Sequence, residues 1–487
     1  MKRKGFFYVL LSGMMLLSCD SWLDHAPYDK VEATKLYTTE AGAQKALNGL
    51  YLSLLDRDLY GESLTAVTLD VLAQLYYIPN EHRLVNLREY EFDILNPRLA
   101  VVWKKIYLLI AECNIFLEEI EKNQAVYPAE NYKLYRGEAL ALRTFLHFDL
   151  FRLFGPLHAG DMDVMGKEYI PYYERYTAIP TPYSTGTEFV SYLFRDINAA
   201  IALLKDDPIL TDGVGWDRED FWGYRSFRMN LFAAQALKAR MYLHAGDKDN
   251  AYRVATALLS DRDPDTGEGN RFSSIITRPP AVTNNTWEPM LFTEFLFGMH
   301  DLNREEVHRS NFSIDLSAAS ILLGSTSYLS ALFNEPEDAR ATIWSPVDIG
   351  GSISVRGFTK YRVVFVSASN PGDPYRYQVI PLIRAGELFL IAAEAAVTDA
   401  ERRLWLEALR ERRGFQRQNT TRFSDAELVD LLAKEHAREF YGEGQYYYYL
   451  KRNNVRSIAS NSSTYNVTMQ DSYYRFTVPE TEENNRK

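Results

Sequence analysis

The sequence is poor in cysteine, has no excess of positive charge and contains no long hydrophobic run. Its 487 residues include only two cysteines, which excludes a disulfide framework. Lys and Arg total 54 and Asp and Glu total 65, a formal net charge of -11, which argues against nucleic acid as the principal partner. No apolar run reaches the roughly 20 residues that a membrane-spanning helix needs. What remains is a globular protein, and 46% apolar residues suffice for a large core.

Aromatic residues, by contrast, are abundant. The chain has 33 Tyr, 26 Phe and 7 Trp. Tyrosine joins an apolar ring to a polar hydroxyl, so it suits binding surfaces as well as cores.

The first residues have the pattern of a secretory signal. Three cations at positions 2–4 precede an apolar run at 6–17 that is too short to remain as a membrane helix. The run ends in the letters LLSC, which resemble a bacterial lipobox. We expect residues 1–18 to be a lipoprotein signal peptide and Cys19 to be lipidated, so that acyl chains hold the mature chain on a membrane. The alternative is an ordinary signal peptide followed by an incidental cysteine.

Helical periodicity dominates the first half of the mature chain. Apolar residues recur three and four positions apart in five segments, at 43–55, 102–120, 132–154, 188–204 and 230–244. Each predicted helix therefore has an apolar stripe, and the helices must pack against one another.

Two later segments predict helical hairpins. At 233–259 an alanine-rich helix, a Gly-Asp break and a second helix follow one another, and a similar pair is expected at 384–413 before a helix at 425–440. Small residues such as Ala236 and Ala239 let two helices approach closely, as in tetratricopeptide hairpins. No 34-residue period is visible, so the repeats are degenerate. The sequence thus predicts a mostly helical chain, a degenerate tetratricopeptide-like (TPR) α-α superhelix.

The pattern changes between about 261 and 380. Pro-Pro, Asn-Asn, Gly-Gly and Pro-Gly pairs punctuate short apolar runs, which predicts loops and brief β-strands. Loops of this length on a rigid scaffold usually carry function, so we expect this insertion to face a ligand. We interpret 19–487 as a single domain whose helical scaffold occupies about 38–260 and 381–450.

Seven segments in order carry a resemblance to a known family. They are CDSWLDHAP at 19–27, AGAQKALNGLY at 41–51, the pattern WxxxYxxIxxxN at 103–114, the helix from RGEA at 136–139 to FGP at 154–156, IR at 383–384 with AEA at 393–395, REFYGEGQYYYYLKR at 438–452 and the closing segment at 476–484. Together they resemble the SusD/RagB family of outer-membrane nutrient-binding lipoproteins. The chain departs from that pattern at Tyr446, where the family has Arg, and at Tyr449, where it has Asp. Any ion-pair network built from those two positions is therefore altered here.

The resemblance implies a binding protein and not an enzyme. It implies a cell-surface lipoprotein of the outer membrane, with four degenerate helix pairs and no cofactor, that sits as a lid on a SusC-like TonB-dependent barrel. Its ligand is an oligosaccharide or, in RagB-like members, a peptide. Two alternatives remain open: a surface glycoside hydrolase on the same anchor, and a structural scaffold that docks proteins through its helical repeats.

Sugar binding requires flat apolar faces for the C–H surface of a pyranose and polar groups for its hydroxyls. The densest such group is WDREDFWGYR at 216–225, a Gly-flanked loop with rings beside charged residues. For each ring, packing beneath a loop is the alternative interpretation. We expect ligand contacts among six rings: Trp216, Trp222, Tyr224, Tyr76, Tyr77 and Trp344.

No catalytic or metal-binding motif stands out. Alternate aspartates at 261–265 suggest a calcium loop, but the following glycine is one residue late and Phe272 stands where an EF-hand needs Glu, which favours a solvated acidic turn. His436 and Glu439 lie one helical turn apart without the second His of a zinc motif. The sequence contains no GxSxG, no P-loop and no CxxC pair.

Overall fold

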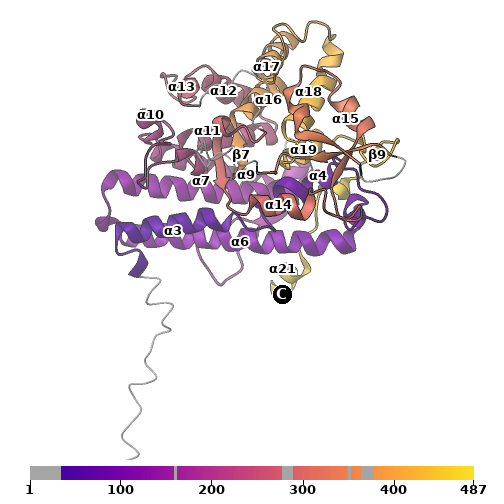
Figure 1. The fold of residues 1–487 in the computed structure, drawn as a ribbon. Coiled ribbons are helices and arrows are strands. Elements are labelled where there is room, and N and C mark those ends of the chain that lie inside the picture. The colour runs from indigo at the N-terminus through magenta and orange to yellow at the C-terminus, as the bar shows by residue number, and fades with distance from the viewer. Residues whose placement is uncertain (1–34, 158–161, 277–288, 349–352, 364–377, 487) are drawn as a thin grey trace, which may run out of the picture.

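The computed structural model describes residues 35–157, 162–276, 289–348, 353–363 and 378–486. The predicted signal peptide and Cys19 lie outside the described residues. Most of the described chain is helical, which confirms the predicted fold class (Figure 1). Within these ranges, no helix combines the length and the apolar character needed to cross a membrane.

Long helices form the lower half of the molecule in the view of Figure 1. They are α3 (Glu40–Ser53), α6 (Phe92–Lys122), α7 (Ala129–Phe154) and α9 (Gly186–Leu203). Helix α7 packs between α6 and α9, and α3 packs on α6. All four were predicted, but α6 begins ten residues earlier than its apolar pattern at 102–120 indicated. The helix continues through Pro97, whose cost is offset because Leu95 and Leu99 on the neighbouring turns are fully buried.

The helical hairpins expected farther along the chain are also present. They are formed by α11 (Leu231–His244) with α12 (Lys248–Leu259), and by α16 (Ala385–Ala395) with α17 (Asp399–Glu411), followed by α18 (Asp425–Glu439) and α19 (Gln445–Arg452). Ala236 and Ala239 are buried in α11, as close packing requires. Helix α12 packs on α16, so hairpins far apart in sequence lie side by side.

The segment between the hairpins contains short strands and loops, as predicted. Strands β3 (Phe295–His300) and β7 (Val379–Arg384) pair antiparallel, and β4 (Leu323–Ser325), β6 (Val355–Phe358) and β5 (Trp344–Val347) form a second sheet in that order. Short helices accompany them: α13 (Phe272–Ile275), α14 (Arg304–Asn311) and α15 (Thr326–Leu332).

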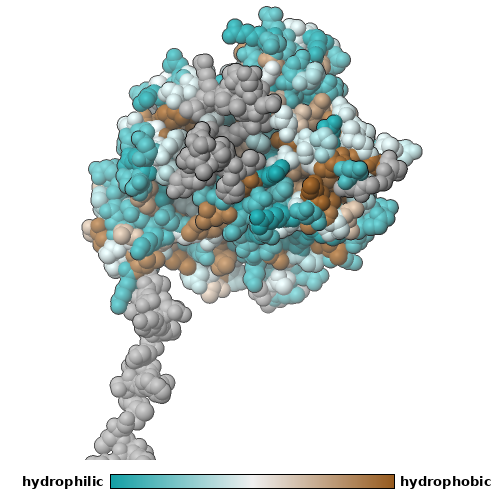
Figure 2. Space-filling model, viewed as in Figure 1, coloured by the Kyte–Doolittle hydropathy of each residue, from teal (hydrophilic) through white to brown (hydrophobic). Residues whose placement is uncertain are grey.

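Smaller elements complete the fold. They are α4 (Thr68–Leu72), α5 (Val85–Arg88), α8 (Met162–Met165), β1 (Glu168–Pro171), β2 (Tyr183–Thr185), α10 (Ile209–Asp212), β8 (Ser457–Ile458), β9 (Val467–Thr468), α20 (Asp471–Tyr474) and α21 (Glu480–Asn485). The largest group of buried apolar side chains draws on α3, α7, α11, β7 and α19, so the two ends of the described chain share a core. Figure 2 shows hydrophobic residues in separate small groups on this face and not in one broad patch.

Candidate ligand-binding site

A hollow of about 610 Å³ opens between helix α3 and the loop at 219–228. Small-molecule sites usually measure about 300–1,000 Å³ and combine apolar rings with a few polar groups. The walls here are of that kind: Gln44, Lys45, Asn48, Tyr51 and Leu52 on α3, Phe221, Tyr224, Phe227 and Arg228 on the loop, and Met299 and His300 on β3.

The helical wall follows from the sequence of α3. The side chain of Thr39 caps the helix by accepting a hydrogen bond from the Gly42 N–H at 3.1 Å. Ala43, Leu47 and Leu50 are buried. Each of these buried residues is followed directly by a polar one, at positions 44, 48 and 51. Because residues three and four apart share a helix face, these polar side chains lie together on the face of α3 that lines the hollow.

The opposite wall is fixed by one buried arginine. The Nε of Arg225 donates to Asp207 Oδ1 at 3.0 Å, and its Nη1 lies 2.5 Å from Glu138 Oε1. Both carboxylates and the guanidinium are fully buried. Two glycines with positive φ, Gly213 and Gly215, lead into this loop, where a left-handed backbone favours glycine. The loop is therefore anchored in the core while its neighbouring rings stay at the surface.

Tyr224 occupies a strained position at the centre of this wall. Its φ is 53°, a left-handed conformation that is uncommon for a bulky residue. Its ring lies parallel to that of Phe227, with centroids 6.2 Å apart, and edge-on to Trp216 at 5.9 Å. Trp216 in turn packs on Phe292 at 4.5 Å. Strain of this kind concentrates at functional sites because surrounding contacts must hold it.

The third ring of the predicted loop cluster points elsewhere. Trp222 stacks on Tyr135 of α7 with centroids 5.6 Å apart and planes at 8°, and it meets Phe221 edge-on at 5.1 Å. It is half-buried and does not line the hollow. The structure thus brings Trp216 and Tyr224 together and separates Trp222 from them.

The other three predicted rings lie in a different part of the fold. Tyr76 is 1% exposed and donates to the Ala66 carbonyl at 2.8 Å, and Trp344 is 5% exposed against Phe358 and Tyr441. Neither offers a free face to a ligand. Tyr77 is half-buried against a small apolar cluster beneath β4 and β6. Tyr76 and Trp344 therefore pack in the core, as the alternative interpretation expected, whereas Tyr77 keeps part of its surface exposed, away from the hollow between α3 and the loop at 219–228.

A buried carboxylate, Glu138, fixes two of the side chains that line the hollow. Glu138 accepts from Tyr51 Oη at 2.9 Å and from Arg228 Nη1 at 3.3 Å. Burial opposes ionisation of Glu138, but Arg225 and Arg228 hold its pKa below the ordinary value. Burial, reinforced by Glu138, raises the pKa of Tyr51 well above its ordinary value. Tyr51 and Arg228 are therefore held in place before any ligand arrives.

Sequence reasoning missed the α3 wall. Gln44, Asn48 and Tyr51 recur at spacings of four and three, the pattern of one helix face. Two amides and a ring on the face beside the apolar stripe of a helix are a recognisable sign of a candidate binding wall. Helical periodicity alone assigns the whole segment to packing, so it does not reveal this face.

The two ends of the chain match related family descriptions. Residues 21–243 match a SusD-like family described as "Starch-binding associating with outer membrane", and residues 348–487 match the SusD/RagB family, described as "SusD family". The chain belongs to the SusD/RagB family. A curated relative, SusD-like protein P25 of Formosa agariphila, is 24% identical over 166 residues. That alignment spans 31% of this chain and 31% of the relative's length.

Solved structures share the fold of this SusD-like chain. A SusD superfamily protein of Bacteroides thetaiotaomicron is 19% identical with a TM-score of 0.64, covering 92% of this chain and 98% of its own. A SusD-like carbohydrate binding protein of Bacteroides vulgatus is 17% identical with a TM-score of 0.67, covering 92% and 96%. These neighbours are TPR-like helical structures, which confirms the predicted superhelix.

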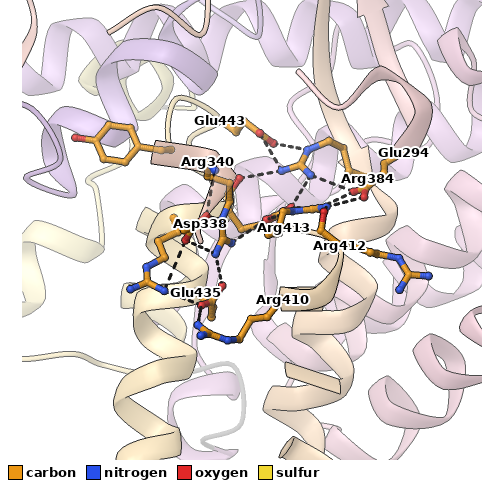
Figure 3. Close-up of polar contacts among 12 residues, drawn as sticks. Glu294, Asp338, Arg340, Arg384, Arg410, Arg412, Arg413, Glu435 and Glu443 are labelled. Atoms are coloured by element: carbon orange, nitrogen blue, oxygen red, sulfur yellow. Dashed lines mark hydrogen bonds and ion pairs between the residues drawn. The ribbon is translucent and has the colours of Figure 1, made fainter. Parts of the chain in front are cut away.

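The SusD-like segment at 438–452 takes part in a buried ion network (Figure 3). Arg384 donates to Glu439 Oε1 at 2.7 Å and to Glu443 at 2.9 and 3.0 Å. Arg413 bridges Glu439 and Glu294 at 2.6 and 2.8 Å. These groups are almost fully buried, so each charge depends on its partners. The network joins the end of β7, the end of α18, the turn after α17 and Glu294 before β3, which identifies the segment as a structural joint.

The two departures from the family pattern form a stack of rings. Tyr446 and Tyr449 lie parallel with centroids 5.9 Å apart, and Tyr449 also stacks on His436 at 4.1 Å. Beside them Arg452 donates to Glu394 Oε2 at 2.6 Å. Aromatic contact thus occupies the place where the family pattern has Arg and Asp.

The acidic turn at 261–265 uses its carboxylates internally. Asp263 Oδ1 accepts from the N–H groups of Asp265 and Thr266 at 3.0 and 2.8 Å, and Lys238 Nζ lies 3.0 Å from Asp265 Oδ1. Across the parts of the chain that the structure describes, no three His, Cys, Asp or Glu residues are grouped to hold a metal ion.

Proposed function

We propose that this SusD-like chain is a cell-surface lipoprotein that captures oligosaccharides and delivers them, without catalysis, to a SusC-like TonB-dependent barrel in the outer membrane. The observation that carries the proposal is the ring-lined hollow between α3 and the loop at 219–228, in a chain of this family. A neighbour in fold, the SusD-like carbohydrate binding protein of Bacteroides vulgatus, supports the same ligand class.

In this proposal Tyr224 is the direct ring contact of the six predicted from sequence. Its ring lines the hollow together with Phe221 and Phe227, and such faces match the C–H surface of a pyranose. Trp216 supports Tyr224 from the side. Trp222, Tyr76, Tyr77 and Trp344 are not part of the proposed site, because none of them lines the hollow.

The proposed membrane attachment rests on the sequence. Removal of residues 1–18 leaves Cys19 as the lipidated first residue, and sixteen positions separate it from Lys35, where the described chain begins. Extended, that stretch reaches at most about 50–60 Å. We propose that residues 19–487 form one domain tethered to the outer membrane within this maximum reach.

The test uses the soluble chain that begins after Cys19. It is run through native gels cast with a panel of polysaccharides, and calorimetry follows with oligosaccharides and peptides. An assay for new reducing ends runs in parallel. We expect retardation by a glycan, heat from its oligosaccharides and no new reducing ends.

Each other outcome is informative. New reducing ends would show a glycoside hydrolase and overturn the non-catalytic proposal. Heat of binding on titration with peptides, together with no retardation by any glycan, would indicate a peptide-capturing member of the family. A Tyr224→Ala variant that binds the glycan as tightly as the parent chain would remove the hollow as the site.

A further inference from the structure

The polar wall of α3 has fixed hydrogen-bonding directions, and these limit what the hollow can recognise. Resting on the proposed function, we propose that Gln44 presents an acceptor and Asn48 a donor to the ligand, so that the site selects neutral hydroxylated sugars over anionic ones. The two amides lie four residues apart on one helix face, with their Cβ atoms about 6 Å apart.

The orientation of the Gln44 side-chain amide follows from the hydroxyl of Tyr135, which has only one proton to donate. Tyr135 Oη donates that proton to Glu40 Oε1 at 2.9 Å. The contact of 2.9 Å between Tyr135 Oη and the Gln44 amide must therefore be donated by Gln44, through Nε2. Asn131 also donates to Glu40, which keeps the carboxylate in place. Gln44 Oε1 is left facing the hollow, and among the described residues it has no hydrogen-bond partner.

The orientation of the Asn48 side-chain amide follows from Arg228, whose guanidinium can only donate hydrogen bonds. Arg228 Nη2 lies 2.6 Å from the Asn48 amide, so the atom facing it must be Oδ1. Arg228 is itself held by Glu138 and lies over the Phe221 ring, with its Cζ 3.8 Å from the ring centre. Asn48 Nδ2 therefore points away from Arg228 on the exposed side of the residue, and no group in the described ranges accepts from it.

A neutral sugar matches this pattern because each hydroxyl both donates and accepts. A carboxylate or sulfate placed against these two amides accepts only. It can pair with Asn48 Nδ2 but gives Gln44 Oε1 no donor, so an anionic group at this position leaves one hydrogen bond unmade.

The remaining charges of the hollow also do not favour an anion. Arg228 is neutralised by Glu138, and the exposed Lys45 shares the lining with Glu219 and Asp220. Recognition therefore relies on rings and amides.

The decisive variant is Asn48→Asp. Its carboxylate still accepts from Arg228, now as a charge-assisted pair, so the melting temperature should not fall. Toward the ligand, however, a donor becomes an acceptor. We expect at least a tenfold loss of affinity for the neutral glycan that the parent chain binds. Gln44→Met, which removes the acceptor without adding charge, should also weaken binding. Gln124→Glu, which adds the same charge on an exposed turn outside the hollow, should bind as the parent does.

Calorimetry with maltoheptaose, xylohexaose and mannohexaose as neutral probes, and hexagalacturonate and a chondroitin sulfate hexasaccharide as anionic probes, separates the outcomes. A neutral probe that binds the parent chain and loses affinity in Asn48→Asp supports the inference. Equal binding by Asn48→Asp, or an anionic probe as the tightest ligand, overturns the inference and leaves the proposed function standing. A parent chain that binds none of these sugars, nor any other glycan on the gels, overturns both.

Discussion

Tyr224 shows how one residue can combine strain with a proposed function. Its left-handed backbone conformation is held by the buried Arg225 beside it and by hydrogen bonds from Tyr224 N and Arg225 N to Gly215 O and Val214 O at 3.2 and 2.8 Å. A glycine would adopt this φ without strain. Under the proposed function, a tyrosine stands there because its ring contacts the ligand.

A pair of variants separates the ring from the strain. Tyr224→Ala and Tyr224→Gly both remove the ring, so both should lose glycan binding. Only the glycine variant relieves the backbone, so it should be more stable to urea than the alanine variant by about 1 kcal/mol. Urea unfolding and calorimetry measure the two effects. If the alanine variant were the more stable, the left-handed conformation would not be a source of strain.

At the scale of single elements, α16 carries a glycine that ordinary helix propensity does not explain. A Cβ at Gly386 would lie against Glu439 Oε1 and 2.8 Å from Arg413 Nη2, both in the buried ion network. Because Gly386 has no side chain, the carboxylate of Glu439 and the guanidinium of Arg413 can lie directly against the backbone of α16.

Gly386→Ala should therefore destabilise the fold by about 1–3 kcal/mol, although alanine gains about 1 kcal/mol in an isolated helix. The matched control is Gly49→Ala in α3, where a Cβ would meet no atom within 4 Å. That change should stabilise by about 0.4–1 kcal/mol. Urea unfolding of both variants tests the contrast, and equal stabilisation by the two would contradict it.

The elements also show where sequence reasoning succeeds. The hairpin α11–α12 could be predicted because Ala236 and Ala239 mark close packing and Gly246, at φ 80°, marks the turn. The pairing of β3 with β7 could not be predicted, because the paired residues lie about 80 positions apart in sequence. A short apolar run does not indicate which other strand it pairs with. The same limit applies to the site. The Gly-flanked loop pointed to Tyr224, which lines the hollow. The burial of Tyr76 could not be predicted, because it depends on Phe312, Phe358 and Tyr441, which only the folded chain brings to it.

At the scale of the whole molecule, buried charge ties stability to pH. Burial opposes the ionised form of Glu435, yet Arg340, Arg438 and Arg410 lower its pKa to about 2. Burial, with nearby arginines, also lowers the pKa of His82 to about 4 and of His147 to about 3. Tyr173 N–H donates to His147 Nε2 at 3.1 Å, so the neutral ring carries its proton on Nδ1, 3.0 Å from the Arg143 carbonyl.

These shifts predict two steps of acid destabilisation. In each case the unfolded chain binds the proton more readily than the folded one, so the stability these groups supply is present above the unfolded pKa and is lost as pH falls toward the folded value. The histidines lower the free energy of unfolding below about pH 6.5, and the carboxylates with lowered pKa do so below about pH 4.5. The free energy of unfolding in urea, measured from pH 8 to pH 4, should therefore decline first in the range where the histidines titrate, above the range where Glu435 contributes. Asp70, whose pKa burial raises well above its ordinary value, contributes with the opposite sign. His147→Gln should reduce the slope between pH 6 and 4 by up to about 1.4 kcal/mol per pH unit, the contribution of one proton. An unchanged slope in His147→Gln would show that His147 titrates alike in the folded and unfolded states.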